Sequence, residues 1–431
     1  MKKMKDSGIE WIGEIPQHWK LERLKFHAVL NPLVDTSDFE NEDEVSFVPM
    51  ENLKSGYHGT SIVSYSKVRK GYTQFNAGDI LIAKVTPCFE NGNIAIASDL
   101  IRDTGFGSTE INVIRCGDIS TKFLFYYMQN PKFIERGVSD MFGVAGLKRL
   151  VPEYIVSSFY PLPPDAEQQA IADYLDRKCG RIDAMISAKE KTNALLKELR
   201  HSLIYEAVTK GLNPSTPMKD SGIEWIGEMP KTWNMSRVKN AYDIVLGKML
   251  QPQPKNDDDE LLDYMCSVNI TWDGIDLTTL KQMWFSQKEK DTYRLRSGDL
   301  LVTEGGDVAV SCIWNEELPE CYIQNAVHRV RAKEGFTNRF LLYWMQVLKN
   351  IGYIDLTCNK ATIAHFTKDK FSDCPFIYCS LDEQQAIADY LDRKCAEIDS
   401  VIAANITTID KLKEYRQSII YEAVTGKTEV A

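Results

Sequence analysis

The stretch EQQAIADYLDRKC at Glu167–Cys179 decides the fold, because it recurs letter for letter at Glu383–Cys395. Two other segments of the chain are also written twice. They are DSGIEWIGE followed by Ile or Met and then Pro, at Asp6–Pro16 and Asp220–Pro230, and YEAVT, at Tyr205–Thr209 and Tyr421–Thr425. Repeated segments in a fixed order predict two copies of one structural unit in the chain.

Each copy consists of a repeated opening, a variable segment and a repeated helical segment. The variable segments still align at GDIL, Gly78–Leu81, and GDLL, Gly298–Leu301, where short apolar runs follow Gly-Asp turns as strands do. The run Phe123–Gln129 instead predicts a buried helix. We therefore expect an α+β fold, with mixed domains at 1–165 and 220–381, long helices at 166–211 and 382–427, and a linker at 212–219.

The repeated helical segments carry apolar residues at three- and four-residue spacing on one face. These seam residues are Ile171, Leu175, Ile182, Ile186, Leu196, Leu199, Leu203 and Ala207 in the first segment, and Ile387, Leu391, Ile398, Ile402, Ile409, Leu412, Ile419 and Ala423 in the second. About 44 residues at 1.5 Å per residue make a helix of roughly 66 Å, which needs a packing partner. We expect the two helices to form a coiled coil, with Lys189, Asn193 and Asn405 interrupting the seam and fixing its register.

The composition is that of an ordinary globular protein, with 44% hydrophobic and 26% charged residues among 431. No eighteen consecutive residues are apolar, so the sequence predicts a cytoplasmic protein without a membrane span. The ten cysteines form no CxxC pair, which favours reduced structural thiols over a zinc site or disulfides. The formal net charge of -10 counts against tight unaided binding to DNA, so a DNA-binding role requires a local basic face or a basic partner.

Motifs for catalysis are missing from the sequence. It contains no GxxxxGK[ST] phosphate loop and no HExxH metal pair, and none of its three Asn-Pro steps continues to Tyr or Phe. The six histidines show no metal-ligand spacing. We therefore expect no catalytic residue, no metal site and no cofactor in this chain.

The two helical segments also share polar residues that a seam does not need. Either a recent duplication or a pair of surfaces that dock two copies of one partner explains this identity. We favour the docking surfaces, because a recent duplication leaves the variable segments alike as well. The predicted docking residues are Gln168, Asp173, Asp176, Arg177, Tyr205 and Glu206, with their counterparts Gln384, Asp389, Asp392, Arg393, Tyr421 and Glu422.

The order of these motifs, repeated along essentially the full chain, resembles that of the type I restriction-modification specificity subunits. The resemblance implies two target-recognition domains, related by an approximate two-fold axis and separated by two long antiparallel coiled-coil helices. Each domain would bind one half of an interrupted site in double-stranded DNA, and the helices would set the spacer length. Two modification subunits, which bind S-adenosylmethionine, would dock on the helices, and restriction subunits would supply cleavage that depends on ATP and Mg²⁺.

Candidate DNA contacts are polar or basic residues on glycine-flanked loops of the variable segments, where side chains can reach base edges. They are Lys84, Thr86, Ser108, Thr109, Lys148 and Arg149 in the first domain, and Thr303, Gln324, Asn325, Arg329, Lys360 and His365 in the second. Base-contacting residues are expected to differ between the two domains, so the tryptophans repeated in both halves are assigned to packing against the helices instead: Trp11, Trp19, Trp225 and Trp233. A two-domain coiled-coil scaffold without DNA specificity is the alternative function.

Overall fold

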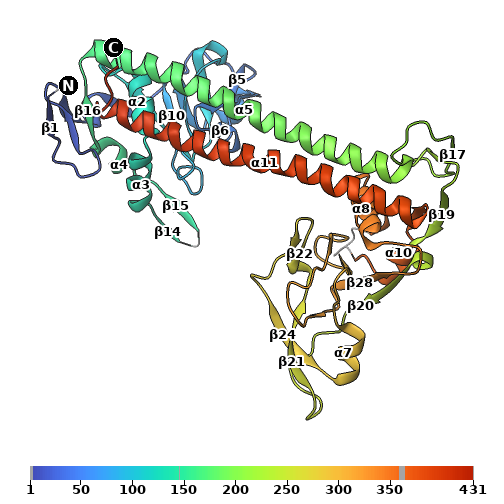
Figure 1. The fold of residues 1–431 in the computed structure, drawn as a ribbon. Coiled ribbons are helices and arrows are strands. Elements are labelled where there is room, and N and C mark those ends of the chain that lie inside the picture. The colour runs from blue at the N-terminus through green and yellow to red at the C-terminus, as the bar shows by residue number, and fades with distance from the viewer. Residues whose placement is uncertain (1–2, 145, 359–364, 431) are drawn as a thin grey trace. The chain divides into compact units, whose positions relative to one another are not determined.

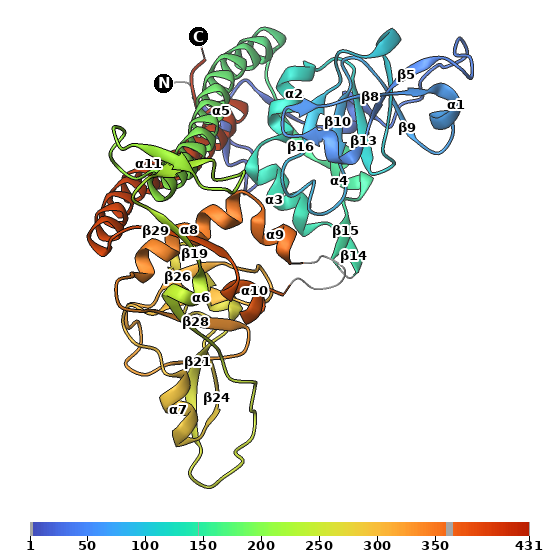
Figure 2. The same cartoon turned by 90° about the vertical axis from the view of Figure 1, so that its right-hand side faces the viewer.

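The computed structural model, drawn in Figure 1 and turned by 90° in Figure 2, describes residues 3–144, 146–358 and 365–430. The chain forms two compact units. Unit 1 is Met1–Glu190 with Ile406–Ala431, and unit 2 is Lys191–Asn405. The long helices α5 (Asp165–Lys210) and α11 (Leu381–Val424) each contribute to both units, so each unit holds one mixed domain and a segment of two helices. The predicted α+β class with two long helices is confirmed.

The domain of unit 1 contains two four-stranded sheets. The first is antiparallel, in the order β11 (Ile94–Ile96), β10 (Ile80–Ala83), β13 (Ile111–Cys116) and β4 (Ala28–Leu30). The second has the order β8 (Ser61–Ser64), β5 (Glu44–Val48), β12 (Thr104–Gly107) and β9 (Thr73–Asn76), with β5 and β12 parallel. Beyond them lie helices α2 (Thr121–Met128), α3 (Pro131–Ser139) and α4 (Pro152–Ser157), with the hairpin β14 (Phe142–Val144) and β15 (Leu147–Arg149) between α3 and α4.

The domain of unit 2 repeats this strand order, with three strands instead of four in its second sheet. Its first sheet is β26 (Ser311–Ile313), β25 (Leu300–Thr303), β28 (Val327–Ala332) and β20 (Tyr242–Leu246). Its second is β24 (Lys281–Phe285), β21 (Glu260–Met265) and β27 (Tyr322–Ile323), again with a parallel pair, β21 and β27. Helices α8 (Asn338–Asn350), α9 (Tyr353–Thr357) and α10 (Lys368–Ser372) follow in the same order as α2, α3 and α4.

Each domain is closed by short strand pairs that involve the repeated openings. In unit 1 these are β1 (Met4–Asp6) with β2 (Glu14–Pro16), and β3 (Lys20–Arg23) with β16 (Phe159–Leu162). In unit 2 they are β17 (Met218–Asp220) with β18 (Glu228–Pro230), and β19 (Asn234–Arg237) with β29 (Pro375–Tyr378). Since β16 and β29 lead directly into α5 and α11, these pairs fix where each long helix begins.

The predicted seam is largely buried, as the spacing of its apolar residues requires. Ile171, Leu175 and Ile182 of α5 lie in the core of unit 1 with Ile419 and Ala423 of α11. The exception is Leu199, which is 47% exposed and therefore lies outside the seam.

The polar interruptions of the seam meet as a pair. The Asn405 amide donates to the Asn193 carbonyl oxygen at 2.8 Å, and Arg200 lies 3.3 Å from Asp399, both within unit 2. Because 193 pairs with 405 and 200 with 399, the helices run antiparallel in this unit. An amide pair inside an apolar seam accepts few alternative registers, so it can fix this one.

Two of the repeated tryptophans pack on the helix ends, and the other two, Trp11 and Trp225, pack partly buried against the cores of their units, in agreement with the predicted packing role. Trp19 and Trp233 are 1% and 0% exposed. Trp19 lies against Gly426, just after α11, and Trp233 against Gly211, just after α5. Both glycines have φ near +75°, at +73° and +76°, which is the left-handed conformation that ends a helix without a Cβ penalty. Each repeated opening therefore caps one long helix.

Candidate functional site

The predicted DNA contacts of the first domain gather where β10 ends. The Lys84 N–H donates to the Glu110 carbonyl at 3.0 Å, and the Lys84 carbonyl accepts from the Leu150 N–H at 2.7 Å. The Thr86 hydroxyl accepts from the Lys148 N–H at 3.0 Å and donates to the Gly146 carbonyl at 2.8 Å. These bonds join β10, the turn that holds Ser108 and Thr109, and the hairpin β14–β15, so the six candidates of this domain lie on one surface.

An ion pair stands at the centre of this surface. Arg149 donates from Nη2 to Glu110 Oε1 at 2.6 Å and from Nε to Oε2 at 3.1 Å. The Arg149 side chain is 52% exposed and that of Glu110 is 27% exposed. The hydrogen bond from Arg149 holds the pKa of Glu110 below its ordinary value, and Lys84 adds to this effect. The pair is thus fixed in one geometry at the protein surface.

The second domain has the same backbone bonds at the end of β25. The Glu304 N–H donates to the Ala326 carbonyl at 2.8 Å, and the Glu304 carbonyl accepts from the Phe366 N–H at 2.8 Å. Glu304 therefore occupies the place that Lys84 has in unit 1, and Ala326 the place of Glu110. His365, which precedes Phe366, occupies the place of Arg149, and its Nδ1 lies 3.2 Å from a Glu304 carboxylate oxygen.

The remaining candidates of the second domain fall into three groups. Gln324 and Asn325 lie beside this strand end, half-buried, where the Gln324 amide donates to the Asn325 side chain and the Asn325 N–H donates to the Lys248 carbonyl at 2.8 Å. Lys360 lies outside the described residues. Thr303 is 1% exposed, and its hydroxyl donates to the Asp307 carbonyl and accepts from the Val310 N–H inside the turn. The prediction that Thr303 contacts DNA is therefore wrong.

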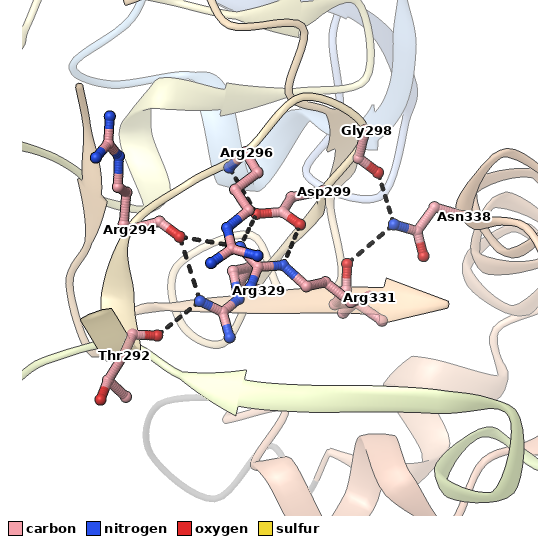
Figure 3. Close-up of polar contacts among 9 residues, drawn as sticks. Thr292, Arg294, Arg296, Gly298, Asp299, Arg329, Arg331 and Asn338 are labelled. Atoms are coloured by element: carbon pink, nitrogen blue, oxygen red, sulfur yellow. Dashed lines mark hydrogen bonds and ion pairs between the residues drawn. The ribbon is translucent and has the colours of Figure 1, made fainter. Parts of the chain in front are cut away.

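The prediction for Arg329 is also wrong, for a similar reason. Figure 3 shows its guanidinium turned to the Thr292 and Arg294 carbonyls, to which it donates at 2.6 and 3.2 Å. Arg329 is 7% exposed, and burial, with the charge of neighbouring Arg331, lowers its pKa to about 10. Arg331 itself binds both oxygens of Asp299 at 2.6 and 2.8 Å. This cluster stabilises the sheet rather than a ligand.

Many of the predicted docking residues bind within their own unit. The Gln168 amide oxygen accepts from the Ser120 N–H at 2.9 Å, and the Gln384 oxygen accepts from the Thr337 N–H at 3.2 Å. Tyr205 donates to the Trp225 carbonyl at 2.7 Å. These bonds attach each helix to its domain or to a repeated opening, so the identity of these residues in both halves follows without a partner.

Most of the other predicted docking residues also bind neighbouring side chains or carbonyls. Asp176 accepts from Lys122 at 2.6 Å and Tyr126 at 2.8 Å, Asp392 accepts from Arg339 and Tyr343, and Asp389 accepts from Arg339 at 2.8 Å. Tyr421 donates to the Trp11 carbonyl at 3.4 Å, Asp173 accepts from Gln169, and Glu422 accepts from Ser418 and Thr428. Among the exposed candidates, Asp389 and Asp392 bind Arg339, whereas Arg177, Glu206 and Arg393 project from the helices. Docking on a partner stays a prediction for this smaller set.

Sequence reasoning missed Glu110 and Glu304, the acidic halves of the two surface pairs. Neither follows a motif. The hydrogen bonds from the Lys84 N–H to the Glu110 carbonyl and from the Leu150 N–H to the Lys84 carbonyl bring Glu110 beside Arg149, and the bond from the Phe366 N–H to the Glu304 carbonyl brings Glu304 beside His365. It also missed Asp79 and Asp299, which anchor Arg115 and Arg331. For these the signal was present, because both aspartates belong to the Gly-Asp turns aligned between the halves.

No metal-binding arrangement stands out on these surfaces. Within 3–144, 146–358 and 365–430, no group of three or more His, Cys, Asp or Glu side chains is placed to hold a metal ion. Nor does any helix in this part of the chain combine the length and apolar character that crossing a membrane requires. All ten cysteines are free, and burial raises the pKa of Cys312 and Cys374 to about 12.

Residues 230–408 match the family described as the type I restriction modification DNA specificity domain. The specificity subunit of the type I restriction enzyme EcoAI of Escherichia coli is 40% identical over 163 residues. That of MjaVIII of Methanocaldococcus jannaschii is 21% identical over 440 residues, which cover 96% of this chain and 94% of that protein. By these comparisons the chain is similar to the type I restriction-modification specificity subunits. The EcoAI alignment spans 37% of this chain and 27% of the relative.

Two solved structures share the fold of this chain. A chain from a type I R-M system, solved for its complex assembly and conformational transition, aligns with a TM-score of 0.72 at 17% identity, over 96% of this chain and 99% of that one. The HsdS subunit of Thermoanaerobacter tengcongensis aligns with a TM-score of 0.52 at 18% identity, over 96% and 98%. At such identities the likeness concerns the fold alone.

Proposed function

We propose that the chain is the non-catalytic DNA-binding subunit of a type I restriction-modification complex in the cytoplasm. Each domain binds one half of an asymmetric, interrupted site in double-stranded DNA. The long helices set the spacer and dock two modification subunits, which bring S-adenosylmethionine. Restriction subunits that use ATP and Mg²⁺ join this assembly.

One observation carries the proposal: the two domains share their architecture and their joints to the helices but differ at the exposed strand ends. The two domains carry different residues at matching backbone positions: Lys84, Glu110 and Arg149 in unit 1 correspond to Glu304, Ala326 and His365 in unit 2. A scaffold that binds the same ligand twice has no use for this difference. Two readers of different half-sites require it, because each base pair presents its own pattern of donors and acceptors in the major groove.

The charge of the chain fits a complex better than a solitary DNA-binding protein. A net charge of -10 disfavours phosphate contacts over the whole surface. Modification subunits that close around the DNA would share those contacts, while the exposed Arg177, Arg393 and Glu206 offer them charged positions on the helices. We expect binding to DNA to be weak for the isolated chain and strong for the complex.

The decisive experiment compares adenine methylation across the genome of the source strain with and without this gene, by long-read sequencing. The expected result is the loss of one two-part motif in the deletion strain and its return on complementation. An unchanged methylome in a strain that expresses the modification subunit would contradict the proposal and favour the scaffold function.

The spacer role has a test of its own. Inserting seven residues after Asn193 and seven before Asn405 lengthens both helices at one level and keeps the seam in phase. The helices grow by about 10 Å, so the spacer should lengthen by about three base pairs while both half-sites stay the same. Insertion in α5 alone is the matched control and should abolish methylation. If the double insertion leaves the spacer unchanged, the long helices do not set its length.

A further inference from the structure

Arg149 in unit 1 and His365 in unit 2 occupy matching backbone positions but differ in side chain. In both units this residue precedes the one whose N–H binds the strand end, Leu150 or Phe366. In both units its side chain also meets a glutamate, but the glutamate comes from different strands: Glu110 before β13, and Glu304 after β25. Both units thus keep a glutamate beside a basic side chain, but the glutamate comes from a different segment in each unit.

The geometry of the first pair leaves one edge of Arg149 available. A guanidinium carries five N–H donors, and Glu110 takes the Nε donor and one Nη2 donor. The two donors on Nη1 and the second on Nη2 point away from the carboxylate along the end of the side chain. That edge presents two parallel N–H groups, the pattern that matches O6 and N7 of guanine in the major groove.

We propose that Arg149 is the specificity-determining contact of the first domain with a guanine, and that Glu110 is the residue that positions it. The inference rests on the proposed function of the chain and names a base pair class for one position of one half-site. Glu110 lowers the rotameric freedom of Arg149 before DNA arrives, so less entropy is lost on binding.

The charges around the pair are compatible with DNA. Lys84 lies close enough to Glu110 to lower the pKa of its carboxyl, so two cations surround one anion. Thr109 and Lys148 add an exposed hydroxyl and an exposed ammonium donor on the same surface. In unit 2 the corresponding places hold Glu304, Ala326 and His365, which cannot form a carboxylate-braced arginine. The second half-site therefore lacks this contact, which explains an asymmetric target.

The test uses the full chain, co-produced with its modification subunit in a host that lacks the methylation, together with a plasmid library in which each position of the site is randomised. Arg149→Ala should lower the preference for a G·C pair at one position of one half-site by about ten- to a hundred-fold. Arg149→Lys keeps the charge but not the two-donor edge and should lose most of that preference. Glu110→Gln should lose several-fold, because Arg149 remains but is less firmly held.

A matched control is present in the same domain. Arg102 binds Asp43 through Nη1 at 2.7 Å and Nη2 at 3.3 Å, with 52% and 22% of their side chains exposed, close to the values for Arg149 and Glu110. Arg102→Ala should leave the motif unchanged. Equal weakening at every sequence in Arg149→Ala would make Arg149 a phosphate contact and overturn the inference, as would an unchanged motif. A wild-type chain that directs no two-part motif would instead overturn the proposed function.

Discussion

In unit 1, Asp176 of α5 accepts hydrogen bonds from Lys122 and Tyr126 of α2, and in unit 2 Asp392 of α11 accepts them from Arg339 and Tyr343 of α8. The carboxylate, the phenol and the cation keep their places, although the cation changes from lysine to arginine. At the ends of β10 and β25 the opposite holds, since lysine is replaced by glutamate and arginine by histidine at matching positions.

This contrast separates two kinds of constraint on one chain. A joint must hold a domain on a helix, and the same bonds serve both units equally well. A surface that binds two different half-sites cannot use the same side chains twice. The joints should therefore respond alike to equivalent mutations in the two units, and the sheets and strand ends should not.

The largest effect is expected at the tryptophans that cap the helices. Trp19→Ala and Trp233→Ala should each destabilise the chain by about 3–5 kcal/mol, because each removes a fully buried indole from a packed helix end. Urea denaturation followed by circular dichroism measures this, with Phe26→Ala as the control, since Phe26 is 67% exposed. A loss for Trp19→Ala alone would break the equivalence of the two joints.

A smaller and unequal effect is expected at the aspartates of the Gly-Asp turns. Asp79 binds Arg115 as Asp299 binds Arg331, through both carboxylate oxygens. In unit 2 the buried Arg329 also lies in the field of Asp299. Asp79→Asn should cost about 1–2 kcal/mol and Asp299→Asn about 2–3 kcal/mol, because the second leaves more positive charge uncompensated.

The control for this pair is Arg329→Met, which removes the extra buried charge. In that background Asp299→Asn should cost no more than Asp79→Asn does in the native chain. Equal losses for the two asparagine variants in the native chain would show that Arg329 adds nothing to the difference between the sheets. Thermal unfolding of the four proteins measures all of these values.

How far the sequence predicts this molecule depends on which contacts are local. The long helices were predicted at 166–211 and 382–427 and lie at Asp165–Lys210 and Leu381–Val424, because apolar spacing, turn residues and Gly211 or Gly426 mark both ends. The seam pattern also marks Asn193 and Asn405 as interruptions, and the structure shows that the two side chains are hydrogen-bonded to each other. The strand order of the domains was beyond reach, since it depends on pairing between strands far apart along the chain.

The candidate site shows the same limit at the level of single residues. Arg149 was chosen as a polar residue on a loop, and the structure places it on the surface. Arg329 was chosen by the same rule and is buried, because position 329 lies in β28 and its side chain meets carbonyls of the segment at Thr292 and Arg294. Composition and loop position do not reveal which face of a strand a side chain occupies.

A buried glutamine attaches each long helix to its domain, and replacing it with leucine should lower the free energy of unfolding by about 2 kcal/mol. Gln168 and Gln384 are 1% and 0% exposed, and each accepts from the N–H that begins a helix, that of Ser120 or of Thr337. Leucine fills the volume but leaves this N–H without its partner in a buried place. Chemical denaturation should give similar losses for both variants, with Gln169→Leu, at an exposed position, as the control. A loss in one unit only would mean that the joints differ in strength.

The smallest effect is the pH dependence that His328 adds in unit 2. Burial lowers the pKa of His328, and the residue at the equivalent position of unit 1 is Asn112. Below the unfolded value of about 6.5 the unfolded chain binds a proton that the folded chain does not, so stability falls as the pH falls, by at most about 1.4 kcal/mol per pH unit. His328→Asn should flatten this slope between pH 6.5 and 5.5, measured by urea denaturation at each pH. An unchanged slope would assign the acid sensitivity to other groups, of which His58, with its pKa also lowered by burial, is the first to replace.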